Sequence, residues 1–258
     1  MKKWYSKIVI ALVFLFLYLP IFVLIVYSFN DSKMNILFEG FTWKWYSVLV
    51  SNRMLLSAFK NTLIVAISST LISVLVGTIS AFGLSRFDFP FKRIVNQLLY
   101  IPIVIPEIVL GISLLSVYTL IRLNLSLFTL ILAHITFSIP YVIVSVRSTI
   151  EGMNPYLEEA SSDLGASSFQ TFFRVTLPSI APGILSGAML AFTLSMDDVV
   201  ISYFTAGPEA NTLPLYIYSM IKSGIRPDVN ALFSILLLIT FICLTIYAVL
   251  LFKKRVRV

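Results

Sequence analysis

Three carboxylates that lie inside apolar stretches are the residues in this chain best placed to do chemistry. Glu107 lies in the run IPIVIPEIVLGISLL, and Asp197 and Asp198 lie in the run SMDDVVIS. A charged side chain at the centre of a bilayer costs about 2.5–3.5 kcal/mol on insertion scales, so an intramembrane acid is a functional-site hypothesis by default. Such carboxylates can replace the hydration shell of a cation or pass on a proton.

The adjacent acids Asp197 and Asp198 cannot both point in the same direction on a helix, because successive residues are about 100° apart. The face of Asp198 also carries Ser202 and Thr205, at steps of four and seven residues. One acid can therefore line a pathway with these hydroxyls while the other hydrogen-bonds a neighbouring helix. The sequence does not decide which acid does which.

Two interpretations of the three acids stay open. In the first, the acids are structural and are held by serine, threonine or arginine side chains. In the second, which we favour, they lie on the path of a cation, because the rings of Tyr100, Tyr203 and Phe204 are close in sequence and aromatic faces attract cations.

Other chemistry has little support in the sequence. The only histidine, His134, lies near Thr136 and Ser138, where packing or hydrogen bonding is favoured over a proton relay. The only cysteine, Cys243, has no intrachain partner, which excludes a disulfide or a thiolate metal cluster. No Walker A loop, HExxH or GxSxG motif is present, so we expect no catalysis, no metal and no cofactor.

Composition places these acids in a membrane. Hydrophobic residues make up 59% of the 258 residues and charged residues 12%, whereas about 25% of a soluble domain is charged. Crossing the hydrocarbon core takes about 20 apolar residues. Six such segments can be found, four of them between charges. They lie between Lys7 and Asp31, Lys60 and Arg86, Arg122 and Arg147, and Asp228 and Lys253, with two acid-containing spans at about 94–120 and 183–205.

These spans predict an all-α protein with six transmembrane helices, because no alternating barrel pattern is present. The first span is too long for a secretory signal and is expected to be retained. Pro102 and Pro106 predict kinks beside Glu107. A stripe of small residues, Ser69, Ser73, Gly77 and Ala81, is compatible with packing inside the chain, which we favour, or with a dimer seam.

The positively charged residues predict the orientation of the chain. With both termini on one side, that side holds 12 of the 19 lysines and arginines, which marks it as cytoplasmic. These 12 are Lys2, Lys3, Lys7, Arg86, Lys92, Arg93, Arg147, Arg174, Lys253, Lys254, Arg255 and Arg257. The net charge of +7 then reflects membrane topology, and no nucleic-acid partner is expected.

A polar insert between two spans, residues 148–182, is the second feature that indicates function. It contains the run EASSDLGASSFQTFFRVTLPSIAPGI from Glu159 to Ile184. The run resembles the EAA loop of ABC importer permeases, although Ser161 stands where that family more often has alanine. In that family the loop forms two short helices that dock into a groove on a cytoplasmic ATPase. The resemblance implies a coupling role for seven residues, which are Glu159, Ala160, Asp163, Gly165, Ala166, Leu177 and Pro178.

The resemblance extends over most of the chain. The runs around Glu107 and Asp198 are similar to those of spermidine/putrescine importer permeases of bacterial plasma (inner) membranes. It implies a single permease domain, 1–258, that passes a small cationic substrate, with the pathway residues Glu107, Asp197, Asp198, Ser202, Tyr203 and Tyr100. The implied partners are a second homologous permease, two ATPase subunits and an external substrate-binding protein.

Three alternatives stay open. Permeases for iron, thiamine and other solutes have similar acids at this position. A proton-coupled secondary transporter could use the same three acids without an ATPase. A membrane enzyme would need a nucleophile and a base that converge, and the single histidine and single cysteine lie in separate spans. The preferred polyamine cannot be read from this chain.

Overall fold

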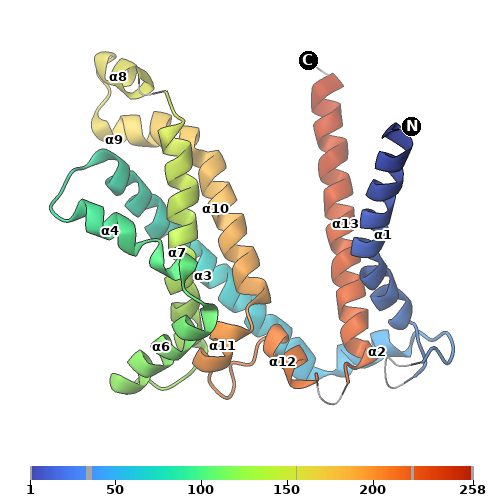
Figure 1. The fold of residues 1–258 in the computed structure, drawn as a ribbon. Coiled ribbons are helices and arrows are strands. Elements are labelled where there is room, and N and C mark those ends of the chain that lie inside the picture. The colour runs from blue at the N-terminus through green and yellow to red at the C-terminus, as the bar shows by residue number, and fades with distance from the viewer. Residues whose placement is uncertain (1, 33–36, 155, 222–223, 257–258) are drawn as a thin grey trace. The chain divides into compact units, whose positions relative to one another are not determined.

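The computed structural model describes residues 2–32, 37–154, 156–221 and 224–256, and the regular elements in these ranges are helices (Figure 1). Two loop lysines and one terminal arginine from the charge count, Lys33, Lys222 and Arg257, lie outside them. The helices are α1 Lys2–Tyr27, α2 Lys44–Ser51, α3 Arg53–Arg86, α4 Lys92–Leu98, α5 Ile101–Val104, α6 Glu107–Leu120, α7 Leu127–Glu151, α8 Tyr156–Asp163, α9 Ser168–Thr171, α10 Leu177–Asp197, α11 Val200–Thr205, α12 Leu213–Ser219 and α13 Pro227–Val256. A π-helical turn, Phe172–Thr176, joins α9 to α10.

The chain divides into two compact units, residues 1–56 with 217–258 and residues 57–216. In the first unit α13 packs against α1 and α2. Trp45 and Leu49 form the buried face of α2, and the Trp45 indole donates to the Asn30 carbonyl at 2.5 Å. The buried Asp228 carboxylate accepts from the Asn52 amide at 2.7 Å and pairs with a guanidinium, that of Arg226, at 3.1 Å.

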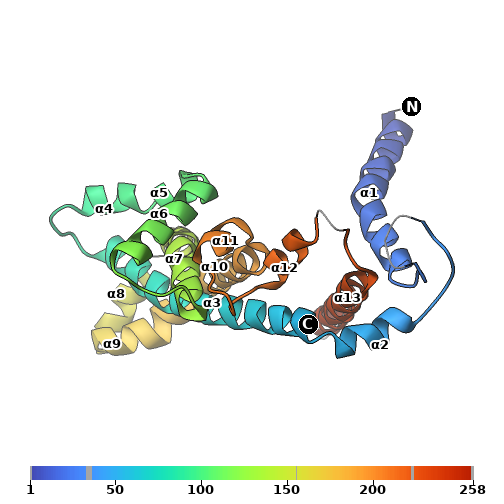
Figure 2. The same ribbon diagram turned by 90° about the horizontal axis from the view of Figure 1, so that it is seen from below.

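The second unit, residues 57–216, is built on the close approach of α7 and α10, which lie side by side in Figures 1 and 2. A Cβ added at Gly187 would lie 3.1 Å from the Cα of Val142, so glycine permits this contact. A Cβ added at Gly77 of α3 would lie 2.7 Å from a methyl carbon of the same valine. Ser69, Ser73, Gly77 and Ala81 are buried, which confirms that the small-residue stripe packs inside the chain.

The membrane spans agree with the predicted number when one broken span is included. Within the described ranges, five helices are long and apolar enough to cross a bilayer, and the segments Lys92–Val104 and Glu107–Leu120 form a sixth candidate that bends by 110°. The predicted span over 94–120 is therefore broken, and the kink predicted at Pro102 and Pro106 is a sharp bend between Val104 and Glu107. Pro106 has an extended backbone, with φ −56° and ψ 134°, and proline cannot continue the hydrogen-bond ladder of α5.

The other acid-containing span is also interrupted. Helix α10 ends at Asp197, Asp198 is extended with φ −63° and ψ 126°, and α11 begins at Val200. The prediction of one helix through 183–205 is thus wrong at its carboxyl end. Both acid-containing spans break within one or two residues of their acids.

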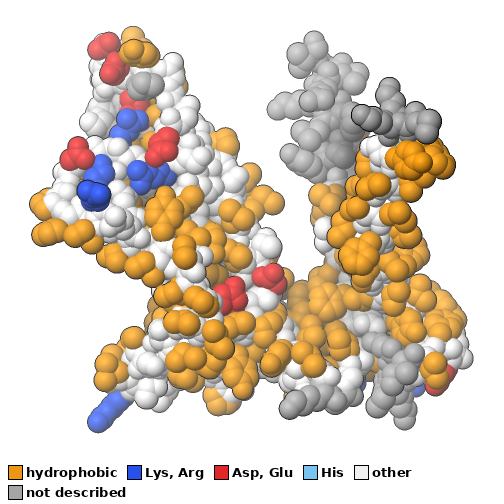
Figure 3. Space-filling view, in the orientation of Figure 1, with side chains coloured by type: hydrophobic (Ala, Val, Ile, Leu, Met, Phe, Trp, Pro, Cys, Tyr) orange, Lys and Arg blue, Asp and Glu red, His pale blue; other side chains and the backbone are white. Residues whose placement is uncertain are grey.

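The polar insert folds into two short helices at the end of the second unit. A tight turn between α8 and α9 contains Gly165, whose φ of +83° belongs to the left-handed region that favours glycine. Because α9 continues through the π-helical turn into α10, a single apolar span runs over Ser168–Asp197. In Figure 3 acidic and basic side chains gather near α4 and α8 at one end of this unit, hydrophobic side chains cover much of its flanks, and further acidic side chains lie at mid-height.

Candidate functional site

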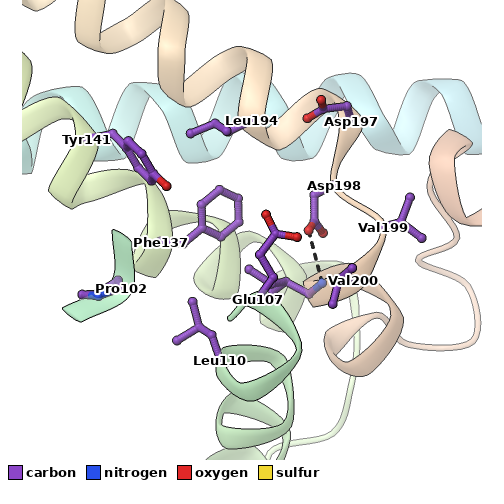
Figure 4. Close-up of a pocket in the computed structure, with 11 residues that line it drawn as sticks. Pro102, Glu107, Leu110, Phe137, Tyr141, Leu194, Asp197, Asp198, Val199 and Val200 are labelled. Carbon is purple, nitrogen blue, oxygen red and sulfur yellow. Dashed lines mark hydrogen bonds between the residues drawn. The ribbon is translucent and has the colours of Figure 1, made fainter. Parts of the chain in front are cut away.

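The two helix breaks bring the three predicted acids to one cavity of about 300 Å³ in the second unit (Figure 4). Glu107 reaches it from the start of α6, and Asp197 and Asp198 reach it from the break after α10. The wall is otherwise largely apolar. Its residues are Pro102, Glu107, Leu110, Phe137, Tyr141, Leu194, Asp197, Asp198, Val199, Val200 and Ile201.

Glu107 and Asp197 are exposed in the described chain and occupy opposite kinds of helix end. Glu107 is the first residue of α6, where the positive end of the helix dipole stabilises a carboxylate. Asp197 is the last residue of α10, where the dipole and the final carbonyl groups add to its negative charge. The end of α10 therefore favours a cation.

Asp198 differs from both, because its side chain is only 4% exposed and is fully engaged. One carboxylate oxygen accepts from the Ser202 backbone N–H at 2.7 Å and from the Ser202 hydroxyl at 2.6 Å. The other accepts from the Ile201 N–H at 3.2 Å. Asp198 thus satisfies the first backbone donors of α11, as a helix-capping residue does.

A buried polar network continues from Asp198 to His134 of α7. The His134 Nε2 lies 3.0 Å from the Ser202 hydroxyl, and its Nδ1 lies 2.6 Å from the Ser195 hydroxyl of α10. Because Ser202 donates its only proton to Asp198, Nε2 must donate to Ser202, and Nδ1 can accept from Ser195. The predicted hydrogen-bonding role of His134 agrees with this network, although its partners come from other helices.

The remaining predicted pathway residues lie elsewhere. Ser202 and Thr205 are fully buried, and the Thr205 hydroxyl donates to the Ile201 carbonyl at 2.8 Å, so neither lines the acid cavity. Tyr203 is exposed and lies edge-on to Phe204. Tyr100 is half exposed and lines other cavities. The aromatic rings at the acids belong instead to Phe137 and Tyr141, which sequence proximity did not indicate.

The structure places most of the predicted coupling residues on an exposed surface. Glu159, Ala160 and Asp163 lie on α8 and are exposed, as are Gly165 and Pro178, whereas Ala166 and Leu177 are half-buried. Leu164, beside the turn, is 89% exposed. A large aliphatic side chain presented in this way at the tip of a helix pair is available to a partner protein.

A residue outside the predicted set anchors this helix pair. The Glu158 carboxylate pairs with the Arg86 guanidinium at 2.7 Å, and it accepts from the Thr176 hydroxyl at 2.7 Å. Glu158 thereby ties α8 to the end of α3 and to the π-helical turn. The signal in the sequence was its position next to Glu159.

Metal chemistry has no support in the part of the chain that the structure describes. Within those residues, no group of three or more His, Cys, Asp or Glu side chains could hold an ion. The cavity offers carboxylates and aromatic rings, and both attract cations.

Comparison with solved structures supports the fold. A crystal structure of a bacterial ABC transporter that imports the acidic polysaccharide alginate has a TM-score of 0.70 at 19% identity, and covers 95% of this chain and 93% of that chain. An inward-facing MetNI methionine ABC transporter has a TM-score of 0.58 at 18% identity, with 80% and 95% covered. At these identities the similarity concerns the fold alone.

Sequence relatives are considerably closer. The spermidine/putrescine transport system permease protein PotC of Escherichia coli K12 is 43% identical over 89% of this chain and 87% of its own length. The putrescine transport system permease protein PotI of the same organism is 37% identical over 89% and 84%. A PotC homolog of Mycoplasma genitalium is 32% identical over 99% and 96%.

The family comparison covers the part of the chain that carries both the acid cavity and the exposed helix pair. Residues 73–258 match the sequence model of the family described as "Binding-protein-dependent transport system inner membrane component". Together with the permease relatives, this match assigns the chain to membrane transport and not to catalysis. The chain belongs to the inner-membrane components of binding-protein-dependent transport systems, the permeases of ABC importers.

Proposed function

We propose that this chain is a permease subunit of an ATP-driven importer that carries polyamines such as spermidine and putrescine into the cytoplasm. The observation that carries the proposal is the cavity at the two helix breaks, where Glu107 and Asp197 present exposed carboxylates and the rings of Phe137 and Tyr141 also line the wall. The 43% identical spermidine/putrescine permease and the 37% identical putrescine permease support the same substrate class.

The chemistry of the cavity matches a flexible organic cation. An ammonium group that leaves water needs negative charge or aromatic faces to replace its hydration, and the cavity supplies both. The methylene segments between ammonium groups can contact the apolar wall formed by Leu110 and Leu194. Asp197, at the negative end of α10, is the strongest candidate for the first contact with the cation.

The complete importer would contain a second homologous permease, two ATPase subunits and an external substrate-binding protein. Both termini and the α8–α9 pair would face the cytoplasm. The exposed tip at Leu164 and Gly165 would enter a groove on the ATPase. Closure of the ATPases on ATP would then move the insert, and α10 would transmit the motion, because α9, the π-helical turn and α10 form one continuous span.

Uptake measurements on variants of the cavity test the proposal. The permease is co-expressed with its partner subunits, reconstituted, and supplied with ATP, binding protein and radiolabelled spermidine. We expect Asp197→Asn and Glu107→Gln to lower uptake several-fold while the ATPase subunits still co-purify. Glu209→Gln is the matched control, because Glu209 is an exposed acid of the same unit that does not line the cavity.

Two outcomes would overturn the proposal, and a third would remove the observation that carries it. Spermidine uptake by the permease alone, which disappears when a protonophore collapses the proton gradient, would favour a secondary transporter. Uptake of another solute, such as thiamine, with no competition from excess spermidine would assign a different substrate. Normal spermidine uptake by both carboxylate variants would remove the acids from the pathway.

A further inference from the structure

A second cavity lies next to the acid-lined one and differs from it in chemistry. It has a volume of about 600 Å³ and is bounded by residues just before and within α5, by α7 and by α10. No charged side chain lines it, and its polar groups are hydroxyls. These belong to Tyr100, Tyr141, Ser145, Ser148, Thr149 and Ser186.

The order of residues along α7 and α10 places this hydroxyl cavity between the acids and the polar insert. On α7, Phe137 and Tyr141 line the acid cavity, and Ser148 lines the hydroxyl cavity closer to the helix end that leads to α8. On α10, Ser186 lines the hydroxyl cavity and Asp197 the acid cavity. The 11 residues from Asp197 to Ser186 span about 16 Å of helix.

Of the described side chains, Tyr141 alone lines both cavities. Figure 4 shows its ring at the edge of the acid cavity, on the side of α7 that Phe137 shares. Among the described residues its hydroxyl has no hydrogen-bond partner, whereas the Ser145 hydroxyl donates to the Gly183 carbonyl at 3.0 Å. Tyr141 is therefore free to contact a solute in either cavity.

The two linings would hold a cation with different strength. Carboxylates near the negative end of a helix hold a cation firmly, because they attract its charge. Hydroxyl oxygens also accept hydrogen bonds from an ammonium group, but they carry no net charge and hold it more weakly. Transport requires sites that are favourable enough to enter and weak enough to leave. A neutral compartment on the cytoplasmic side of the acids meets the second requirement.

We propose that the hydroxyl cavity is the exit compartment of the cation pathway and that Tyr141 is the residue past which the cation leaves the acids. This inference rests on the proposed function, because it takes the substrate to be an organic cation. It assigns no new substrate. It adds the hydroxyl cavity, as a site of release, to the acid cavity, where the cation would bind. Tyr141 is then a specificity-determining residue. Its ring face attracts the cation, and its hydroxyl oxygen accepts a hydrogen bond from the ammonium group.

Thiol modification tests the exit compartment in the complete importer. Cys243 is first replaced by serine, and Ser186→Cys is introduced. Leu185→Cys is the matched control, because Leu185 is exposed on the same helix, next in sequence, and does not line the cavity. A quaternary-ammonium methanethiosulfonate is applied from the ATPase side, and labelling rate and spermidine uptake are measured.

We expect the bulky cationic adduct at Ser186→Cys to abolish uptake, and spermidine under turnover to slow its formation. The same reagent on Leu185→Cys should react at a rate independent of spermidine and leave uptake intact. Tyr141→Leu should lower uptake about 2- to 30-fold, the range of a partly to fully desolvated cation–π contact. Tyr141→Phe, which keeps the ring, should lose less.

The outcomes separate this inference from the proposed function. Normal uptake by the modified Ser186→Cys importer, or labelling that spermidine does not slow, would refute the exit compartment while the polyamine function stands. Absence of spermidine uptake by the unmodified importer would refute the proposed function and this inference with it. Equal uptake by Tyr141→Leu and the parent importer would remove Tyr141 from the path.

Discussion

Replacement of Asp198 should lower the thermal stability of the permease. Replacement of its neighbour Asp197 should instead lower uptake and leave the stability unchanged. The Asp198 carboxylate accepts two backbone N–H groups at the start of α11 and the Ser202 hydroxyl. Asparagine keeps one acceptor oxygen and turns an amide donor toward groups that are themselves donors. We therefore expect Asp198→Asn to leave at least one buried donor unpaired.

The expected magnitude follows from that count. One unpaired buried donor costs about 1–3 kcal/mol. Alanine at Asp198 would leave both backbone N–H groups unpaired, so its cost should be roughly twice as large, about 2–6 kcal/mol. For chains of 150–250 residues, each kcal/mol shifts the melting temperature by roughly 2–4 °C. We expect a fall of several degrees for asparagine and a larger one for alanine.

The assay is thermal unfolding of the purified complex in lipid nanodiscs, with uptake measured on the same preparations. Asp197→Asn serves as the control, because Asp197 is exposed and should lower uptake without a change in melting temperature. The reasoning would be refuted if Asp198→Asn and Asp198→Ala melted with the parent protein. It would equally fail if Asp197→Asn were the less stable variant.

Three further predictions concern the polar insert and the contact between α7 and α10. Gly165→Ala should insert normally but lose ATP-driven uptake, since φ of +83° is strained for alanine although no atom lies within 4 Å of the added Cβ; parental uptake would exclude this turn from coupling. Glu158→Gln should weaken coupling by loosening the contacts with Arg86 and Thr176, which co-purification and ATPase stimulation would detect, and Glu209→Gln, an exposed acid outside the insert, is its control. Gly183→Val should destabilise the chain by about 1–3 kcal/mol, because a Cβ there meets the Thr149 side chain and lies 3.1 Å from the Ser145 carbonyl, and an unchanged melting temperature would contradict it.

The number of spans and the place of the insert could be predicted from the sequence because both depend on local composition. Apolar segments of sufficient length must be helical in a bilayer, whatever their neighbours are. The turn at Gly165 was also predictable, since glycine between two short helical segments indicates a left-handed residue. No atom lies within 4 Å of a Cβ added at Gly165, so the preference for glycine there is conformational and not steric.

The two helix breaks could not be predicted from the length of the apolar segments, because that length does not determine the direction of the helix axis. Pro102 and Pro106 signalled a kink, but not a bend of 110° between the helices they flank. The interpretation that placed Asp198, Ser202 and Thr205 on one pathway face assumed a continuous helix. In the structure Asp198 precedes α11 and meets Ser202 as a capping residue, so the same spacing produces a buried contact.

Contacts between residues that lie far apart along the chain could not be predicted from the sequence either. Thr136 and Ser138 are the hydroxyl residues closest to His134 along the chain, but its ring nitrogens lie near Ser195 and Ser202, 61 and 68 residues away. Likewise, Tyr141 reaches the acids through the packing of α7 against α10 and not through proximity in sequence.

The buried network and the exposed acid act together at the break after α10. Irregular backbone at membrane depth is tolerated where it is buried in protein or lines a cavity, because unpaired N–H and C=O groups are costly there. Asp198 satisfies the N–H groups that the break frees in α11. The last carbonyls of α10 have no intrahelical partner, and they lie beside the Asp197 carboxylate at the negative end of the helix. In the proposed pathway a passing ammonium group would complete the hydrogen bonding of these carbonyls, so the break itself would contribute to cation binding. Neutralising Asp197 should consequently weaken transport without abolishing it, because the carbonyl groups remain.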